Sequence, residues 1–139
     1  MIKIASSVLR EIYQHTETSY PYECCGLMIG TMGGEAKVVH AFRKCRNLNT
    51  ESARDGYLMD PKDQLRATME FQDSPWDIIG IYHSHPDHPS RPSQTDTDGA
   101  YSGYSYVIIS VQQGKVASAN SWVLNEGEGK FYEEPLAPV

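Results

Sequence analysis

The order of apolar and polar residues along the chain predicts helices that alternate with strands. Between residues 6 and 20, apolar side chains recur at the three- and four-residue spacing that lets a helix bury one face. Ser6 or Ser7 can cap the start of this helix, and Pro21 ends it because proline has no backbone N–H to donate. The first helix is therefore expected over this range.

A second helix is predicted from Asp60, its expected N-cap, to about Phe71. Pro61 suits the first helical position, because the N–H that proline lacks would have no helical partner there. Leu65 and Met69 lie four residues apart, so we expect them to form the apolar side of this helix.

Six shorter apolar runs, bounded by turn residues, are predicted to be strands. They span residues 24–32, 35–46, 77–85, 104–111, 117–124 and 130–132. Gly33-Gly34 joins the first two as a hairpin, and residues 57–59 can add a short edge strand. No pattern follows the last run, so residues 133–139 are expected to be a loose tail.

Strands that alternate with helices favour an α/β fold, in which helices cover a mixed sheet. The chain has 139 residues, and no repeat, low-complexity tract or linker divides it, so we expect one domain over residues 1–139. No apolar run approaches the ~18 residues needed to span a bilayer, which argues against a membrane protein. The first residues lack the apolar core of a signal peptide, and a cytoplasmic location is the default expectation.

Charge and cysteine content narrow the function further. The formal net charge of -6, with scattered basic residues, argues against nucleic-acid binding, which draws on clustered Lys and Arg. The three cysteines, Cys24, Cys25 and Cys45, are odd in number, which fits a reducing compartment better than a disulfide framework. We expect them to pack as small apolar residues, although Cys24 can also be sensitive to oxidation or bind metal weakly.

The candidate chemistry lies at the end of the third predicted strand. His83 and His85 are two residues apart, and strand side chains alternate between faces, so both imidazoles are expected on one face. Neutral imidazole nitrogens suit zinc, and a catalytic zinc site commonly has three protein ligands and one open position. A third ligand is therefore needed. Asp96 is a good candidate, and spacing alone does not exclude the rivals Asp87, His88 and Asp98.

The segment after the histidines explains how Asp96 can reach them. Pro86, Pro89 and Pro92 end the strand and stiffen the connection, because each fixes φ and removes a backbone donor. Ser93 and Asp96 then have the spacing of a capping box, which places both side chains on the first turn of a helix. A hydroxyl and a carboxylate are thus expected to face the end of the strand.

The pattern His83-x-His85-Pro86, followed by Ser93-x-x-Asp96, resembles the metal motif of the JAMM (MPN+, Mov34/PAD-1) metalloproteases, and the compact chain is similar to their small prokaryotic members. Glu23 stands where that family has an upstream glutamate, and the resemblance covers nearly the whole chain. It implies an MPN or JAB domain with a deaminase-like α/β/α arrangement. It also implies one Zn²⁺ per chain, held by His83, His85 and Asp96.

The resemblance implies a zinc-dependent metallopeptidase, in which the metal activates a water and polarises the scissile carbonyl. Glu23 is then the expected general base, although nothing in the residues alone separates it from Glu11, Glu17 or Glu51. Ser93 would hydrogen-bond the tetrahedral oxyanion. Its other expected role is that of a helix N-cap, and one hydroxyl is not expected to do both.

The family also implies a substrate, namely a peptide or isopeptide bond after the C-terminal Gly-Gly of a ubiquitin-like protein. The expected partner is a small sulfur-carrier protein of the ThiS or MoaD type, from which cysteine or a short extension is released. Trimming of ubiquitin chains is less expected, because 139 residues leave no room for the insertions of the eukaryotic members. His88 and Arg91 are expected to line the entrance or face solvent. The sequence does not indicate an oligomeric state.

The motif is compatible with other interpretations. A non-catalytic MPN scaffold is marked by lost metal ligands, and none is lost here; a small-molecule metal hydrolase on the same fold stays open. Residues 83–88 also match the H-x-H-x-D-H string of metallo-β-lactamase-like hydrolases, but those need later histidines and none follows His88. Zinc deaminases use cysteine ligands from a C-x-x-C motif, which is absent.

Overall fold

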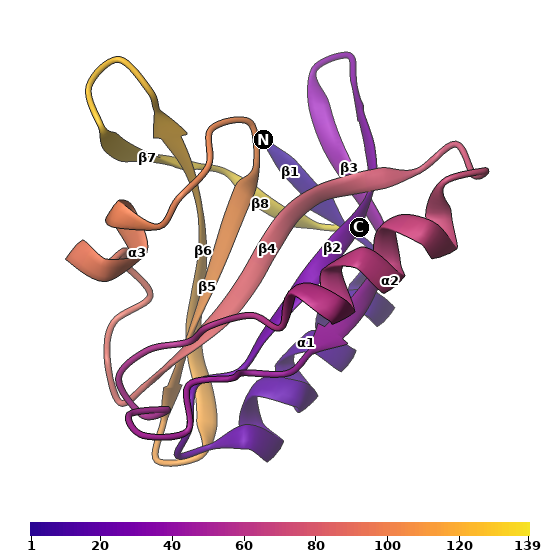
Figure 1. Ribbon diagram of the computed structural model, residues 1–139. Coiled ribbons are helices and arrows are strands. Elements are labelled where there is room, and N and C mark those ends of the chain that lie inside the picture. Colours follow the sequence, from indigo (N-terminus) through magenta and orange to yellow (C-terminus); the bar gives the residue numbers. More distant parts are fainter.

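A computed structural model describes residues 1–139 and contains eight strands and three helices. The strands are β1 (Ile2–Ile4), β2 (Cys25–Gly33), β3 (Ala36–Cys45), β4 (Asp77–Pro86), β5 (Ser105–Gln112), β6 (Lys115–Asn125), β7 (Lys130–Glu134) and β8 (Leu136–Pro138). The helices are α1 (Ser6–Ser19), α2 (Pro61–Phe71) and α3 (Gln94–Asp98). All strands belong to one sheet with the order β7-β6-β5-β4-β2-β3-β1-β8 (Figure 1).

The sheet is mixed, and its two central strands carry the histidines and their support. β4 runs antiparallel to β2 and parallel to β5. It is buried from Ile79 to its end, because it has a strand neighbour on each side and covered faces above and below. The predicted α/β fold with a mixed sheet is confirmed. No helix is both long and apolar enough to span a bilayer.

Two apolar clusters cover the two faces of the sheet, as the alternation of strand side chains requires. On one face, α1 packs Leu9 and Ile12 against Met28 of β2, Tyr82 of β4 and their neighbours. The other face gathers the alternate residues of the same strands, beneath α2, including Leu27 and Ile81 with Ala67. The expected α/β/α layering is therefore present.

The prediction that Leu65 and Met69 form the buried side of the second helix is wrong, because each is 60% exposed. The stripe of α2 that faces the sheet instead contains Asp63, Ala67 and Phe71, four residues apart. Asp63 accepts a hydrogen bond from the Arg46 backbone N–H (2.8 Å), and this contact holds the same side of α2 against the sheet. A small residue, Ala67, then lets the helix approach the strands closely.

The prediction of a loose C-terminal tail is also wrong. Residues 130–134 form β7, and residues 136–138 form β8, which pairs in parallel with the N-terminal strand β1. The sequence reading missed both three-residue strands, although Ile2 and Ile4 are fully buried. Only Pro135 separates β7 from β8, which lie at the two ends of the strand order, so the sheet curls back on itself here.

A cluster of polar groups lies where the sheet curls. Glu134 accepts hydrogen bonds at Oε1 from the hydroxyls of Ser105 (2.5 Å) and Ser121 (2.8 Å). Its Oε2 lies 3.4 Å from the Met1 amino group, and Lys37 donates to the Ser105 hydroxyl (2.8 Å). We call these five residues the Glu134 cluster. It joins β1, β3, β5, β6 and β7 near the start of β5.

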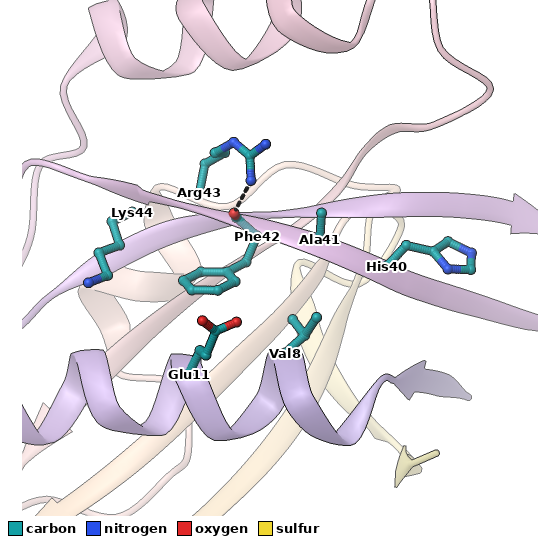
Figure 2. A pocket seen from close by; sticks show the side chains of 7 residues that line it. All are labelled: Val8, Glu11, His40, Ala41, Phe42, Arg43 and Lys44. Carbon is teal, nitrogen blue, oxygen red and sulfur yellow. Dashed lines mark hydrogen bonds between the residues drawn. The ribbon is translucent and has the colours of Figure 1, made fainter.

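One edge of the sheet is partly free. The pairing of β3 with β1 covers residues 37–39 and ends at Val39. The later residues of β3 therefore have no strand neighbour on that side. A cavity of about 510 Å³ lies beside this edge, lined by residues of β3 and α1. Figure 2 shows Phe42 pointing toward Glu11 of the helix. Arg43 points the other way and donates from Nη1 to the Phe42 carbonyl (2.8 Å), which covers one unpaired edge group.

Candidate active site

His83 and His85 end the central strand β4 and face the same side of the sheet, as the sequence predicted. Their Nε2 atoms lie 3.1 Å apart, and the two residues are only 1% and 6% exposed. The Nδ1 of His85 lies 2.8 Å from the Pro89 carbonyl oxygen, which can only accept, so Nδ1 carries the hydrogen. The lone pair of His85 therefore sits on Nε2, on the side of His83.

The short helix α3 brings Asp96 to this pair. Its oxygens lie 3.2 Å from His83 Nε2 and 3.1 Å from His85 Nε2. The capping box expected from the sequence is present: Asp96 N–H donates to Ser93 Oγ (3.1 Å), and Ser93 N–H donates to Asp96 Oδ2 (2.9 Å). The cap therefore fixes the carboxylate at the end of β4.

The rival carboxylates are engaged elsewhere. Asp87 accepts hydrogen bonds from the Tyr20 hydroxyl (2.6 Å), the Gln113 backbone N–H (2.8 Å) and Arg54 (3.1 Å). Asp98 accepts from Gln94 on its own helix (2.8 Å). Of the three aspartates weighed from the sequence, Asp96 is the one that the structure places against both histidines.

The donor atoms have the spacing of a metal site. Zinc bonds of ~2.0–2.1 Å in a tetrahedron imply ligand atoms about 3.3 Å apart. The separations among His83 Nε2, His85 Nε2 and the Asp96 oxygens, at 3.1–3.2 Å, are close to this value. Glu23 also belongs to a group that could hold a metal, since it, His83 and His85 offer ligand atoms within 4.8 Å of one another. The tighter spacing makes Asp96 the better fit as third ligand.

Electrostatics at the site favour a cation between these groups. Burial lowers the pKa of His83 and keeps its imidazole neutral. Burial also disfavours a charge on His85, but the Asp96 carboxylate and the Pro89 carbonyl outweigh it and raise its pKa. Burial opposes ionisation of Asp96, yet its hydrogen bonds with the two histidines lower its pKa well below the usual range. The site thus favours positive charge beside Asp96, which a metal ion can supply.

Glu23 lies at the entry to β2 and is only 7% exposed. Its backbone is fixed on both sides, because its N–H donates to the Ala53 carbonyl (2.7 Å) and its carbonyl accepts from Asn47 Nδ2 (3.1 Å). Its Oε1 is buried without a hydrogen-bond partner. Burial raises the pKa of Glu23 to about 8; nearby Asp96 and Asp55 raise it as well, and His85 opposes them.

The other glutamates considered as a base lie elsewhere. Glu11 lines the cavity of Figure 2, on the α1 side of the sheet. Glu17 accepts a hydrogen bond from the Val116 N–H (2.9 Å), and Glu51 is exposed on the loop between β3 and α2. The structure therefore separates Glu23 from these three, which the residues alone did not.

The expectation that Ser93 cannot both cap α3 and bind an oxyanion does not hold. As a cap, Ser93 accepts the Asp96 N–H with an oxygen lone pair. A hydroxyl has one hydrogen to donate and two lone pairs, so its hydrogen stays free for a second partner. Capping and oxyanion binding use different parts of the same group.

The loop between β3 and α2, residues 46–60, contributes to the site, and the sequence did not predict this role. Asn47 uses all four of its amide hydrogen bonds: Nδ2 donates to the carbonyls of Glu23 and Gly56, and Oδ1 accepts from the N–H groups of Asn49 and Leu58. An asparagine that opens a long polar loop was the available signal. The short strand expected at residues 57–59 reduces to a single bridge between Asn47 and Met59.

Tyr57 from the same loop packs against the site. Its ring centroid lies 4.6 Å from that of His83, with the ring planes tilted by 31°. Burial raises the pKa of Tyr57, so its hydroxyl stays protonated. The 46–60 loop thus fixes Glu23 through Asn47 and covers His83 with an aromatic ring.

The loop after β4, residues 87–90, is anchored at every residue. Asp87 N–H donates to the Val111 carbonyl (2.7 Å), and the His88 carbonyl accepts from the Ser110 hydroxyl (2.6 Å). Pro89 holds His85, as described above, and the Ser90 carbonyl accepts from Trp122 Nε1 (3.0 Å). These contacts position the carbonyl that orients His85.

A cavity of about 410 Å³ opens beside the site, and none of its lining residues is a large apolar one. It is lined by Glu23, Asp55, His85, His88, Pro89, Arg91, Pro92 and Ser93. His88 and Arg91 therefore line the entrance and are exposed, as expected. The larger cavity of Figure 2 has no comparable convergence of ligand atoms, so size alone does not identify the functional site.

The three cysteines are free and buried. Burial raises the pKa of all three thiols, that of Cys45 to about 12. A protonated thiol is a poor nucleophile and a poor metal ligand. The prediction that the cysteines pack as small apolar residues is confirmed.

Comparison with known proteins extends the resemblance found in the sequence. A family model described as "Prokaryotic homologs of the JAB domain" matches residues 5–125. A desampylase from Haloferax volcanii is 31% identical over 121 residues, which are 86% of this chain and 84% of that protein. A CysO-cysteine peptidase from Mycobacterium tuberculosis is 25% identical over 140 residues, covering 100% of this chain and 92% of that protein.

A solved structure supports the same likeness in three dimensions. The solution structure of a protein from Desulfitobacterium hafniense matches with a TM-score of 0.86 and 28% identity. The match covers 100% of this chain and 93% of that one. The terminal strands β1 and β8 thus lie within the matched region.

Proposed function

Because the chain belongs to the family of prokaryotic homologs of the JAB domain, we propose that it is a zinc metallopeptidase of the JAMM type that acts on a ubiquitin-like protein. The observation that carries this proposal is the buried convergence of Glu23, His83 and His85, whose ligand atoms lie within 4.8 Å of one another. Asp96 completes the set at 3.1–3.2 Å from the two imidazoles. A non-catalytic scaffold would have no need of this buried, charged group.

The side chains of His83, His85 and Asp96 would hold one Zn²⁺. When bound, the ion supplies a Lewis acid that polarises the scissile carbonyl and makes a water acidic. The protein holds its ligands in the required states: a neutral His83, a His85 lone pair on Nε2, and an ionised Asp96. The Pro89 carbonyl orients His85, and the Ser93 backbone N–H orients Asp96, each through a hydrogen bond.

Glu23 is the proposed general base. It takes a proton from the attacking water at its unpartnered Oε1 and returns it to the departing amine. Burial raises the pKa of Glu23 and so makes its carboxylate a stronger base, while a cation held beside it would favour the ionised form that accepts the proton. Asn47 keeps the Glu23 backbone in place, and so fixes where the carboxylate can reach.

Ser93 is the proposed oxyanion donor. Its hydroxyl hydrogen is free, while its oxygen accepts the Asp96 N–H. One such donor is worth about 2.7–4 kcal/mol of transition-state stabilisation. Ser93 also lines the 410 Å³ cavity, where the scissile carbonyl would lie.

The proposed substrate is a ubiquitin-like sulfur-carrier protein of the ThiS or MoaD type, cleaved after its C-terminal Gly-Gly. The name of the mycobacterial relative supports a peptidase that acts on a cysteine-bearing carrier, and that of the haloarchaeal relative supports processing of a conjugate. Both relatives are matched over most of their own length, so the likeness covers most of each of those proteins.

The test is to incubate the zinc-loaded protein with a carrier that ends in Gly-Gly-Cys and to follow the carrier by mass spectrometry. We expect a mass loss of one cysteine residue. The Glu23→Gln protein should bind zinc but leave the carrier intact, and Glu51→Gln, at an exposed site, should behave as wild type. An unchanged carrier with fully zinc-loaded wild-type protein would contradict the proposal for this substrate class.

A further inference from the structure

The cavity beside Glu23 has an acidic wall and a basic wall. Glu23 and Asp55 come from the entry to β2 and from the 46–60 loop, whereas His88 and Arg91 come from the segment between β4 and α3. The proposed hydrolysis gives Glu23 a role but gives none to Asp55, His88 and Arg91. A ligand that meets both walls would carry an amine toward the acidic wall and an anionic group toward the basic wall.

Arg10 and Arg91 are the two arginines without a partner in the chain, and Arg91 is the one that lines this cavity. Arg43, Arg46, Arg54 and Arg66 each form an ion pair with a carboxylate of the chain. Arg91 forms no ion pair and no side-chain hydrogen bond, and neither do the side chains of Asp55 and His88 in the same cavity. Its five N–H donors are therefore available to a bound anion.

The backbone before Arg91 is held rigidly. The Ser90 carbonyl accepts a hydrogen bond from Trp122 Nε1. The Ser90 hydroxyl forms hydrogen bonds with the side chains of Ser118 (2.8 Å) and Asn120. Pro92 follows and fixes its own φ. Less backbone freedom is thus lost when Arg91 binds a ligand, which lowers the entropic cost of recognition.

The lining also argues against a lysine side chain as leaving group. The four methylene groups of a lysine side chain gain stability from apolar contacts, and this cavity has no aliphatic or aromatic residue beyond two prolines and two histidines. A single amino acid joined through its α-amine has a short body and a free α-carboxylate. Carboxylates match the fork of an arginine guanidinium, which donates two parallel hydrogen bonds.

Given the proposed function, on which this inference rests, we propose that Arg91, assisted by His88, binds the α-carboxylate of a single amino acid that is the leaving group. The substrate class is then a carrier that ends in Gly-Gly-amino acid, rather than a lysine-linked conjugate.

Hydrolysis breaks the amide C–N bond between the last glycine and this amino acid. The water oxygen becomes part of the new glycine carboxylate, and a water proton passes through Glu23 to the leaving nitrogen. The amino acid departs with its own α-carboxylate unchanged, still facing Arg91.

The experiment compares three carriers that differ only at the last bond. One ends in Gly-Gly-Ala with a free α-carboxylate, one ends in the same alanine as an α-carboxamide, and one is linked to a lysine side chain. Alanine avoids thiol binding to zinc. We expect wild-type kcat/KM to be about tenfold higher for the carboxylate carrier than for the carboxamide carrier, because the carboxamide loses one charge-assisted hydrogen bond to Arg91. The lysine-linked carrier should have the lowest kcat/KM.

Arg91→Gln should remove this preference, mainly by raising KM for the carboxylate substrate, while kcat/KM for the carboxamide stays within about twofold. Arg91→Lys should keep part of the preference, because it retains the charge without the fork. The matched control is Arg10→Gln, since Arg10 is exposed on α1, on the other face of the sheet, and should change nothing.

Binding to the Glu23→Gln protein gives a second readout that needs no turnover. The carboxylate carrier should bind about tenfold more tightly than the carboxamide, and Arg91→Gln should abolish the difference. Cleavage without any preference for the carboxylate, or a better lysine-linked substrate, would overturn the inference and leave the proposed function standing. Preferential binding without cleavage by wild type would instead uphold the inference and count against the peptidase.

Discussion

Two carboxylates at opposite ends of the β4–β5 pair, the half-buried Glu134 and the buried Glu23, have opposite surroundings. Glu134, near Ser105 at the start of β5, has a hydrogen-bond or ion-pair partner for each oxygen. Glu23, near His83 and His85 at the end of β4, leaves Oε1 buried without a partner. An unsatisfied buried polar group costs stability, and it persists where a function uses it. We therefore expect the Glu134 cluster to serve the fold, whereas Glu23 is the carboxylate proposed for chemistry.

The largest effect on zinc content and activity should come from removing a proposed metal ligand near Glu23. His83→Ala is expected to lose both zinc and peptidase activity, because one of two buried imidazoles that define the site is gone. Metal content per chain, measured after dialysis in chelator-free buffer, should fall from near one to near zero. Far-UV circular dichroism checks that the fold survives. Retained stoichiometry would mean that the ligands are others.

Glu23→Gln should separate binding from turnover. The amide is close in size to the carboxylate but cannot take a proton, so we expect near one zinc per chain and a fall in kcat of about 10²–10⁴-fold, the usual contribution of a general base. Zinc content and single-turnover rates measure the two effects. An unchanged rate would move the base to another residue.

The pH dependence of stability should also follow from Glu23 in the metal-free protein. Its pKa is raised to about 8 in the folded chain, against ~4.3 in an unfolded chain. Between these values the folded state holds a proton that the unfolded state has lost, so Glu23 lowers stability as pH rises from about 4.5 to 8. Burial lowers the pKa of His15 and His83, which acts in the opposite direction below about 6.5, so the net fall should be clearest between about 6.5 and 8. Urea unfolding at several pH values, with chelator, should show this fall.

Glu23→Gln should flatten that part of the pH profile, because glutamine does not titrate. Glu51→Gln, at an exposed position on the 46–60 loop, is the control and should keep the wild-type slope. A slope that survives in Glu23→Gln would assign the pH dependence to other groups.

The smallest effect should be at the Glu134 end and should concern stability alone. Glu134→Ala leaves the Ser105 and Ser121 hydroxyls without their acceptor, which we expect to cost about 1–3 kcal/mol of unfolding free energy. Peptidase activity of the folded variant should not change. Glu126→Ala, at an exposed turn, is the matched control. A loss of activity with stability intact would break the contrast between the two ends.

What the sequence predicted correctly depends on local spacing. His83 and His85 share a face because strand side chains alternate, and Ser93 and Asp96 form a cap because of their three-residue separation. These rules act within a few residues, so the two histidines and Asp96 could be named as candidates, although spacing alone did not separate Asp96 from its rivals. Glu23 was found only by family resemblance, because about 60 residues separate it from His83.

What the sequence did not predict depends on distant contacts. The three-residue strands form only through distant pairing, of β1 with β3 and β8 and of β8 with β1, and neither has a pattern long enough to recognise. The side of α2 that faces the sheet is set by the contact of Asp63 with Arg46. The four-residue spacing of Leu65 and Met69 gave no sign of this contact. Asn47 likewise acts through the Glu23 carbonyl, far from it in sequence.

The most direct measurement is a crystal structure of the zinc-loaded protein, with anomalous diffraction at the zinc edge. One peak per chain is expected within about 2.0–2.2 Å of His83 Nε2, His85 Nε2 and an Asp96 oxygen. The Glu23 carboxylate should lie nearby without touching the ion. Two peaks, or Glu23 in place of Asp96 as a ligand, would contradict the division between metal-holding and proton-transferring carboxylates.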